Sequence, residues 1–368
     1  MFLNDGSTNA LMELLRVLSK EGNDFLIIYS RKSDRLAELN MQGIQTVRIP
    51  YLRSSDRGYA GIIRIAYLAI LSIINAVALL RMFIVSRSFK PQLVHTNVSP
   101  IHLGYYLSKI LKVPHIWHLR EFRRREDKSQ PVFSYDNFLR LLKDSHSIAT
   151  TKSIKDFYDL SDCRVIYDGV IKNAATEKLS PLEARTNSFL FVGRVEKSKG
   201  IELLIESFAL FSREHEEWKL DVVGAGSDSY LMELKKRIHE LGIGGKVNFY
   251  GACSDVNAKM RERKVVVISS FSEGFGYVTV EAMNNKCFVI ANDNTGTKEQ
   301  LDNARDIMGH DVAYRFTDSE ELLNQMKRFV NEDYARLQAK VDEAYNVVNS
   351  LYGVDRYASD VLNYYKSL

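Results

Sequence analysis

The chain has 368 residues, of which 45% are hydrophobic and 26% charged, so a disordered chain is excluded and two domains are expected. The net charge of +4 conceals an asymmetry: residues 1–180 hold 26 Lys+Arg and 17 Asp+Glu, or +9, whereas residues 181–368 hold 24 and 29, or −5. The first half is therefore the one expected to face an anionic surface or substrate. No nucleic-acid partner is expected, because no recognition motif accompanies the charge.

The first half alternates helices with short buried strands, beginning with a helix at residues 7–20. Only Met1–Leu3 can supply a strand ahead of that helix, so the opening strand is expected to be short or missing. The alternation predicts an α/β domain whose parallel sheet is covered by helices. The further predicted strands are 24–30, 45–49, 92–95, 115–118 and 147–151, and the further helices are 62–85, 101–111 and 135–143.

The alternation pauses near residues 166–175 and then restarts, which predicts a boundary between two doubly wound domains at 170–187. Ligands of such folds bind beyond the carboxyl ends of the strands, here expected in a cleft between the domains. The predicted strands are 188–192, 219–223, 247–250, 265–269 and 288–291. The predicted helices are 201–212, 229–241, 256–262, one beginning near 277, 319–329 and 332–351.

The stretch FVGRVEKSKG (191–200) places cations between a strand and a helix. The strand ends at Gly193, and Arg194, Lys197 and Lys199 follow before the helix begins. A helix N-terminus with such cations suits a diphosphate, because the backbone amides and the helix dipole add to the side-chain charges. A solvated basic turn is the alternative interpretation.

A second glycine turn, VGAGSDS (223–229), follows another strand. Gly224 and Gly226 are present, but Ser229 stands where a dinucleotide fold would carry a third glycine. An acidic residue closing a second strand about 20 positions on is also missing. The stretch therefore predicts a tight turn that lets a nucleotide approach the backbone, not a dehydrogenase.

The stretch SEGFGYVTVEAM (272–283) sets two carboxylates eight positions apart. Glu273 lies in the loop after a buried strand, and Glu281 lies in the first turns of the next helix. Gly274 and Gly276 between them bring backbone N–H groups close to a ligand without side-chain obstruction. Carboxylates accept hydrogen bonds from sugar hydroxyls, so a sugar site is predicted; a helix with favourable N-terminal charge is the alternative.

Together these motifs resemble the retaining glycosyltransferases of family 4, which have the GT-B fold. GRVEKSKG and EGFGYVTVEAM match the two signatures of that family, the second being its E-x7-E motif. VIYDGV (165–170) resembles its interdomain stretch, with Asp168 where asparagine is usual. The resemblance implies an acceptor-side domain at 1–170, a nucleotide-sugar domain at 171–351, and a helix at 352–368 that returns to the first domain.

The resemblance also implies a role for each matching residue. Arg194 and Lys199 would hold the donor diphosphate and stabilise it as it leaves. Glu281 would bind the nucleotide ribose, and Glu273 the hydroxyls of the transferred sugar. His118 matches a histidine that reaches the donor sugar; as an isolated histidine it would more often be an ordinary buried one. The residues expected to approach the donor through their backbone are Gly6, Gly193, Gly224, Gly274, Phe275, Gly276 and Tyr277.

The implied reaction is metal-independent transfer of a sugar, with retention, from a nucleotide sugar such as a UDP- or GDP-sugar. No cofactor or metal is expected, since the chain has no D-x-D sequence. The acceptor would be a glycan or a lipid-linked saccharide in surface polysaccharide biosynthesis. A GT-B phosphorylase or epimerase and a non-catalytic sugar-nucleotide-binding protein remain as alternatives.

The location is expected to be cytoplasmic. Cys163, Cys253 and Cys287 are scattered without metal spacing, which indicates a reducing compartment, and Met1–Gly6 lacks the features of a signal peptide. The most apolar stretch is 62–85.

Only sixteen residues separate Arg64 from Arg81 in that stretch, short of the ~20 that span a bilayer, so a transmembrane helix is not expected. Either the helix is buried in the first domain or one face lies at the inner face of the cell membrane. Basic residues around the helix (Arg48, Arg53, Arg57, Arg81, Arg87) and in a second cluster (Arg120, Arg123, Arg124, Arg125, Lys128) could meet anionic lipid or an acceptor pyrophosphate, or be simply solvated.

Overall fold

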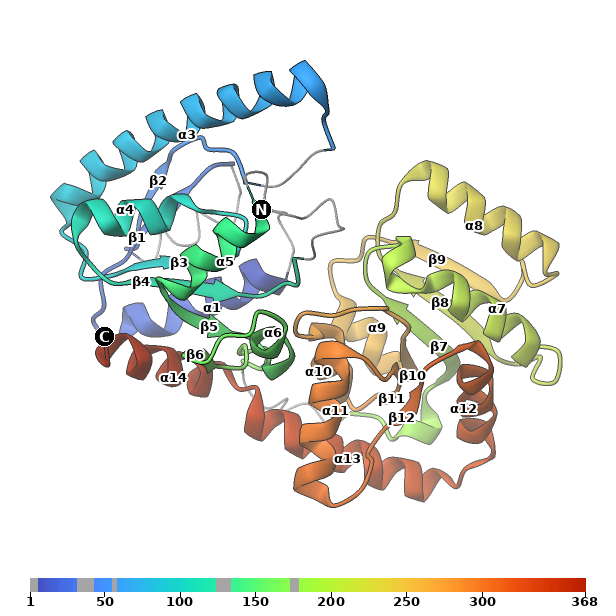
Figure 1. The fold of residues 1–368 in the computed structure, drawn as a ribbon. Helices are drawn as coiled ribbons and strands as arrows, with labels where there is room; N and C mark the ends of the chain where they lie inside the picture. Colours follow the sequence, from blue (N-terminus) through green and yellow to red (C-terminus); the bar gives the residue numbers. More distant parts are fainter. Residues whose placement is uncertain (1–5, 32–42, 55–57, 124–133, 173–178) are drawn as a thin grey trace. The chain divides into compact units, whose positions relative to one another are not determined.

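The computed structural model describes residues 6–31, 43–54, 58–123, 134–172 and 179–368 (Figure 1). Of the stretches discussed above, Met1–Leu3, Arg57 and the basic residues Arg124, Arg125 and Lys128 lie outside these ranges. The chain divides into two compact units. The first unit comprises Met1–Gly169 with Val354–Leu368, and the second comprises Val170–Gly353.

The first unit holds two separate parallel sheets where one was expected. Strands β1 (Leu26–Tyr29) and β2 (Gln45–Arg48) pair with Leu26 beside Gln45. The other sheet has the order β3-β4-β5-β6. Its strands are β3 (Val94–Thr96), β4 (His115–Leu119), β5 (His146–Ala149) and β6 (Cys163–Val165).

Helices cover both faces of the four-stranded sheet, as the alternating pattern predicts. Ile116 of β4 packs against α1 (Gly6–Lys20) and α14 (Val354–Lys366), so the last helix belongs to the core of the first unit. Trp117, the next residue, points to the other face and packs against α5 (Tyr135–Lys143). Successive strand residues point to opposite faces, which is why neighbouring residues belong to different clusters.

Two elements of the first unit were missed from the sequence. Helix α6 (Lys152–Phe157) is short, and it begins where the Thr151 hydroxyl accepts a hydrogen bond from the Ile154 amide. Strand β6 has three residues, too few for a visible alternation. Both are stabilised by neighbours in the fold more than by their own sequence pattern.

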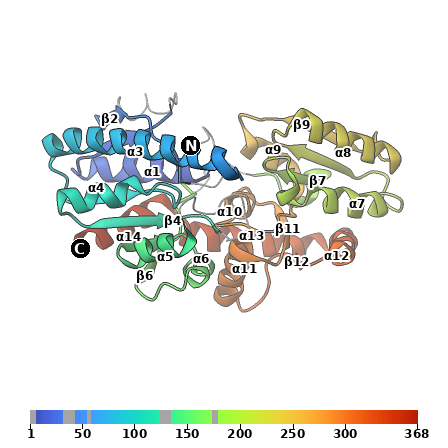
Figure 2. The ribbon, with the colours of Figure 1, turned by 45° about the horizontal axis from the view of Figure 1, so that its top comes forward.

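The second unit contains a six-stranded sheet of order β12-β11-β10-β7-β8-β9, in which every pair is parallel. A doubly wound α/β unit of this kind is confirmed. In Figure 2, α7 (Ile201–Phe211) and α8 (Asp228–Glu240) lie beside strands of this sheet. The strands are β7 (Thr186–Val192), β8 (Lys219–Val223), β9 (Val247–Gly251), β10 (Arg263–Ile268), β11 (Phe288–Asn292) and β12 (Tyr314–Phe316).

The core of the second unit is aromatic. Phe189 of β7 is fully buried and contacts Phe208 and Phe211 of α7 and Trp218. Helix α11 (Thr295–Met308) and strand β12 were not predicted, because α11 has a polar sequence and β12 has three residues. The remaining helices are α9 (Val256–Glu262), α10 (Tyr277–Asn284), α12 (Ser319–Asn331) and α13 (Tyr334–Leu351).

Helix α3 (Gly61–Phe89) of the first unit is not buried, contrary to one of the two interpretations of its sequence. Its buried residues are Leu71, Ala78, Met82 and Ser86, while most of its other side chains are open to solvent. Helix α4 (Leu103–Leu111) packs against its buried side. Among the described residues, α3 is the one helix whose length and composition would suffice to cross a membrane.

Candidate functional site

The sheet of the second unit changes direction between β7 and β10. From β7 the chain continues to β8 and β9 on one side, whereas β10, β11 and β12 follow on the other side. In open parallel sheets, ligands bind beyond the carboxyl ends of the strands at such a switch point. The two predicted signatures follow these two strands: Arg194 and Lys199 come after β7, and Glu273 comes after β10.

The loops that follow β7 and β10 are joined by hydrogen bonds. The Phe271 amide donates to the Ser198 carbonyl at 3.1 Å, and the Ser269 hydroxyl donates to the Lys199 carbonyl at 2.8 Å. Gly200 is required at this crossing, because its φ is +64° and a Cβ there would lie 2.0 Å from the Ser269 carbonyl oxygen. The backbone thus fixes the two signatures against each other.

An ion pair connects the two signatures. Lys199 Nζ donates to Glu273 Oε1 at 2.7 Å, and the side chains keep 19% and 20% of their exposure. An ion pair with this much solvent contact contributes little to stability, typically below about 1 kcal/mol. Both charges therefore remain able to exchange partners with a ligand.

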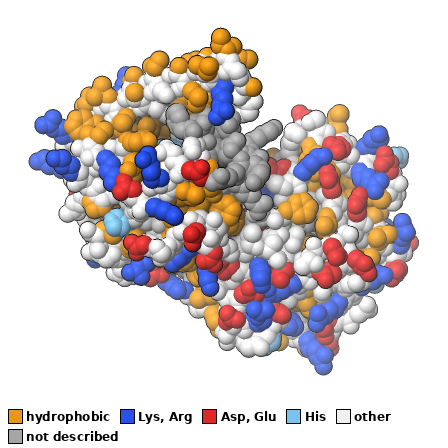
Figure 3. Space-filling view, in the orientation of Figure 1, with side chains coloured by type: hydrophobic (Ala, Val, Ile, Leu, Met, Phe, Trp, Pro, Cys, Tyr) orange, Lys and Arg blue, Asp and Glu red, His pale blue; other side chains and the backbone are white. Residues whose placement is uncertain are grey.

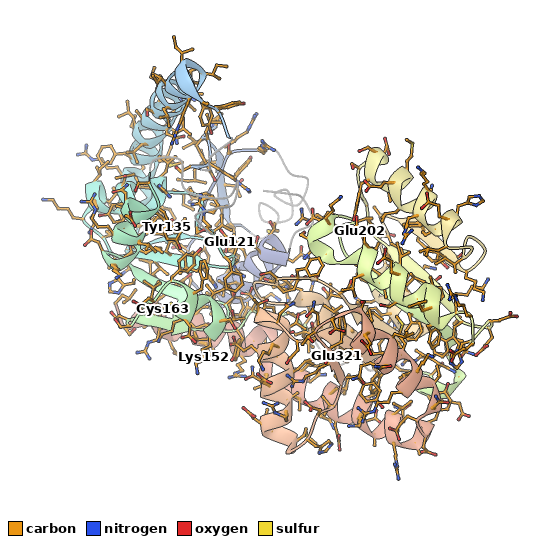
Figure 4. The ribbon with its side chains drawn as sticks, turned by 45° about the vertical axis from the view of Figure 1, so that its right-hand side comes forward. Glu121, Tyr135, Lys152, Cys163, Glu202 and Glu321 are labelled. Carbon is orange, nitrogen blue, oxygen red and sulfur yellow. The ribbon has the colours of Figure 1, made fainter. Side chains whose placement is uncertain are left out.

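The other cations of the first signature, Arg194 and Lys197, are more exposed to solvent than Lys199. Arg194 is largely exposed and donates to Glu196 Oε2 at 2.9 Å, while Glu196 Oε1 accepts from the Ser198 hydroxyl at 2.7 Å. Lys197 is exposed and lies 3.9 Å from Glu202, which Figure 4 labels in the second unit. Arg194 and Lys199 therefore have different carboxylate partners in the described structure.

Gly193 and Gly224 lie back to back where β7 and β8 end. A Cβ on Gly224, whose φ is +145°, would lie 1.7 Å from the Gly193 carbonyl oxygen. The Gly193 amide donates to the Val223 carbonyl at 3.0 Å. Gly224 is needed for this close backbone approach, and Gly193 is needed for its φ of +149°, which other residues rarely adopt.

The loop from Glu273 to Tyr277 is held by the start of α11, which the sequence analysis missed. The Glu273 amide donates to the Thr295 hydroxyl at 2.8 Å, and Gln300 Nε2 donates to the Phe275 carbonyl at 2.6 Å. The Gly296 amide donates to the Glu273 carbonyl at 3.0 Å. The sequence signal for this helix was the polar run TGT (295–297), which follows strand β11 after two residues.

Two residues of that loop have distinct roles in the fold. Gly276 has φ +89° and immediately precedes α10, so a side chain there would be strained. Phe275 is buried, and its ring contacts those of Tyr277 and Tyr352. The Phe275 ring therefore packs in the interior, and only its backbone is suited to meet a ligand.

Glu281 lies in the second turn of α10 and is half-buried. Burial raises the pKa of its carboxyl from 4.5 to about 7. Its carboxylate oxygens have no hydrogen-bond or ion-pair partner among the described residues. A partly buried carboxylate without a donor carries a desolvation cost, and hydroxyl donors from a ligand would reduce that cost.

His118 is in the first unit, near the carboxyl end of β4, and is fully buried. Arg120 donates to its Nδ1 at 3.4 Å, which leaves the ring hydrogen on Nε2, 3.9 Å from Asp168 Oδ1. Burial and the nearby Arg120 charge hold the pKa of His118 well below its usual range. The imidazole is therefore neutral and has no open surface among the described residues.

The family comparison concerns mainly the second unit. Residues 175–346 match the model of the family described as glycosyl transferases group 1. This stretch is therefore similar to glycosyl transferases group 1 over somewhat less than half of the chain. It contains the switch point, both signatures and Glu281, whereas His118 and Gly6 lie outside it.

Two curated relatives and one solved structure extend the comparison. The lipopolysaccharide core biosynthesis mannosyltransferase LpcC of Rhizobium leguminosarum bv. viciae is 27% identical over 179 residues, 48% of this chain and 49% of LpcC. The uncharacterized glycosyltransferase MJ1607 of Methanocaldococcus jannaschii is 26% identical over 306 residues, 75% of each chain. The chain thus spans about half of LpcC and three quarters of MJ1607.

The solved structure is that of Alr3699/HepE from Anabaena, determined in complex with UDP and with UDP-glucose. It shares 18% sequence identity with a TM-score of 0.76, over 99% of this chain and 97% of HepE. At this identity the likeness shows the fold alone. The GT-B fold class expected from the sequence is confirmed.

Outside the matched residues 175–346, the first unit adds buried polar groups near the end of β4. Glu121, labelled in Figure 4, accepts from the Ser99 hydroxyl at 2.7 Å and from the Ser99 amide at 2.9 Å. Burial raises the pKa of its carboxyl in spite of these bonds.

Gly6 is the first residue of α1. No cluster of three His, Cys, Asp or Glu side chains suited to a metal ion occurs in the described ranges.

Proposed function

We propose that this protein is a retaining, metal-independent glycosyltransferase that moves a sugar from a nucleoside diphosphate sugar to a saccharide acceptor. The observation that carries the proposal is the Lys199–Glu273 ion pair, which joins the two signatures across the switch point of a glycosyl transferases group 1 domain. The unpartnered carboxylate of Glu281 supports it, since an NDP-sugar offers hydroxyl groups at both ends of its diphosphate.

On this proposal, the donor diphosphate takes over the cation of the ion pair. A phosphate carries more negative charge than the Glu273 carboxylate and is the stronger partner for Lys199, so donor binding would release Glu273 to accept hydrogen bonds from the sugar. As the nucleoside diphosphate departs, negative charge grows on its oxygens, and Lys199 with Arg194 would stabilise that charge. The amides of residues 274–277 at the start of α10 add donors in the same place.

Glu281 would bind the nucleotide ribose. A diol can donate two hydrogen bonds to one carboxylate, and these favour the ionised form. Donor binding is therefore expected to lower the raised pKa of Glu281. Retention would follow from attack by the acceptor on the same face from which the nucleotide leaves.

The acceptor and the compartment are further parts of the proposal. The name of the relative LpcC refers to lipopolysaccharide core biosynthesis, which supports a glycan or lipid-linked saccharide acceptor in surface polysaccharide synthesis. The three cysteines Cys163, Cys253 and Cys287 are all described and all unpaired, which supports a cytoplasmic location.

The test begins with a thermal-shift screen of UDP- and GDP-sugars, because a ligand that binds the folded state raises its melting temperature. Sugars that bind are then assayed for nucleotide release with saccharide acceptors, with and without EDTA. The anomeric configuration of the product is read by NMR. We expect acceptor-dependent release, insensitivity to EDTA, and a product with the donor's configuration.

Other outcomes would contradict the proposal. Donor binding without hydrolysis or transfer to any acceptor would favour a non-catalytic sugar-nucleotide-binding protein. Sugar release that requires inorganic phosphate would favour a phosphorylase. An inverted product would remove the retaining assignment and leave the donor site in place.

A further inference from the structure

Helix α3 is apolar on two opposite faces, and the described residues cover only one of them. Leu71, Ala78 and Met82 recur at helical spacing and are buried against a cluster that includes Ile49 and Leu103. This buried side already provides what an amphipathic helix needs to pack on its domain. The apolar residues on the other side are therefore not required for packing within the first unit.

The second apolar face is open to solvent over the length of the helix. At 100° per residue its side chains form one stripe opposite the buried side. Ile73 is 65% exposed and Leu80 is 60% exposed, so these are not marginal cases. Figure 3 shows hydrophobic side chains gathered over α3. The stripe, called the open face below, consists of Ile62, Ile65, Ile70, Ile73, Val77, Leu80 and Ile84.

The sequence on either side of α3 is strongly basic. Residues 40–119 contain nine basic side chains and one acidic side chain, Asp56, a balance of +8. Among the basic residues, Arg64, Arg81 and Arg87 belong to α3 and are exposed. An aliphatic stripe flanked by basic side chains is complementary to a surface that has an apolar interior and an anionic outer layer. A second copy of this chain fits poorly, because it would bring two strongly basic segments together.

The packing also determines how α3 can meet a bilayer. A helix that crosses the hydrocarbon core must be surrounded by lipid or by other spanning segments. Here the side with Leu71, Ala78 and Met82 packs within the first unit, and only sixteen residues lie between Arg64 and Arg81. The helix can therefore lie in the interface with its open face inward, but it cannot cross while the unit is folded.

We propose that the open face of α3 is a docking surface for an anionic phospholipid bilayer, with the helix lying in the plane of the membrane. The aliphatic stripe enters the boundary between head groups and acyl chains, and Arg81 and Arg87, which lie at or beside the stripe, meet the lipid phosphates. This surface is independent of the proposed sugar transfer, since it lies in the first unit and shares no residue with the donor site.

The first experiment is co-sedimentation of the full chain with vesicles of phosphatidylglycerol and phosphatidylcholine. The double variant Ile73→Glu/Leu80→Glu is expected to lose at least tenfold in vesicle partitioning with an unchanged melting temperature. The matched control is Leu210→Glu/Met232→Glu, which changes two exposed apolar side chains of the second unit and is expected to bind vesicles like the wild type. The triple variant Arg64→Gln/Arg81→Gln/Arg87→Gln is expected to bind less, most clearly at low salt.

A second experiment measures depth. A tryptophan is placed at Ile73 or at Ile84, and its fluorescence is quenched by lipids brominated at defined positions; the native Trp117 and Trp218 are both buried. Equal, shallow depths at both positions are expected for a helix in the membrane plane. Clearly different depths would mean that the helix crosses the bilayer, and the in-plane proposal would be wrong.

The proposal is also overturned if the wild type does not partition into anionic vesicles at any salt concentration, or if the Ile73/Leu80 variant partitions like the wild type. A wild type that is dimeric without lipid, and becomes monomeric in that variant, would assign the open face to a second copy instead. A failure here leaves nucleotide-sugar binding by soluble protein unaffected.

Discussion

The two units both place charged side chains near the carboxyl ends of parallel strands, but they surround them differently. In the first unit, Arg120 and Asp168 pair with side-chain exposures of 3% and 0%, and Arg120 also donates to the Tyr357 hydroxyl at 2.9 Å. In the second unit, Lys199 and Glu273 pair at about 20% exposure. A fully buried pair is part of the core, whereas a pair that keeps about a fifth of its exposure can exchange partners with a ligand.

The difference follows from what covers each strand end. Helix α14 returns to the first unit and brings Tyr357 over the group formed by His118, Arg120 and Asp168. At the switch point of the second unit, the ends of β7 and β8 carry Gly193 and Gly224, which add no side chains. Similar chemistry at similar positions is thus structural in one unit and accessible in the other.

The largest expected effect is on the buried pair. Arg120→Ala leaves the Asp168 carboxylate buried without its cation, and we expect the free energy of unfolding to fall by about 3–5 kcal/mol. Denaturant unfolding followed by circular dichroism measures this. The double variant Arg120→Ala/Asp168→Asn should recover part of the loss. If Arg120→Ala is as stable as the wild type, the buried Arg120–Asp168 pair does not stabilise the fold, and its contrast with the Lys199–Glu273 pair is wrong.

Lys199→Ala is expected to affect activity instead of folding. Removing a fixed cation from the leaving diphosphate should lower turnover at least tenfold, while the melting temperature changes little. Lys197→Ala, two positions away and exposed, is the matched control and should keep near-wild-type turnover. Steady-state kinetics with the donor found in the screen measures the turnover of both variants. Equal turnover in both variants would remove Lys199 from the donor site.

Glu281→Gln should stabilise the free protein while impairing its function. Between pH 4.5 and about 7 the folded state holds the Glu281 proton more tightly than the unfolded state, so wild-type stability falls as pH rises through this window. The variant lacks this loss. Its free energy of unfolding should therefore exceed that of the wild type by roughly 1–3 kcal/mol at pH 8 and by little at pH 4.5.

The same variant should bind the donor more weakly, because an amide cannot replace the carboxylate as acceptor for two hydroxyls. Calorimetric melting at both pH values, with and without donor, measures both effects. A variant less stable than the wild type at pH 8, or one whose donor affinity is unchanged, would contradict the role assigned to Glu281.

The smallest expected effect is the interaction energy between Lys199 and Glu273. A double-mutant cycle of Lys199→Met and Glu273→Gln, without donor, should give an interaction energy below about 1 kcal/mol. A coupling of several kcal/mol would indicate that the pair is structural like Arg120–Asp168, and the comparison between the two units would fail.

Much of the second unit was predictable because its signals are local. Helices α7 and α9 and strand β8 begin and end within one residue of the predicted bounds, since apolar spacing marks each of them. Helix α11 was missed because its sequence is polar, and its position depends on hydrogen bonds from Gln300 and Gly296 to the loop before α10. Such contacts across the chain leave little trace in a sequence window.

The sequence by itself determined the parallel α/β architecture and the two signatures, because strand and helix periodicity and glycine turns depend on neighbouring residues. Only the tertiary structure decided that Lys199 pairs with Glu273, that Glu281 has no partner within the described ranges, and that His118 is enclosed by Arg120 and Tyr357. It also decided that one apolar face of α3 is covered and the other open. Burial and pairing depend on segments distant in the chain, so a pattern of residue types leaves them open.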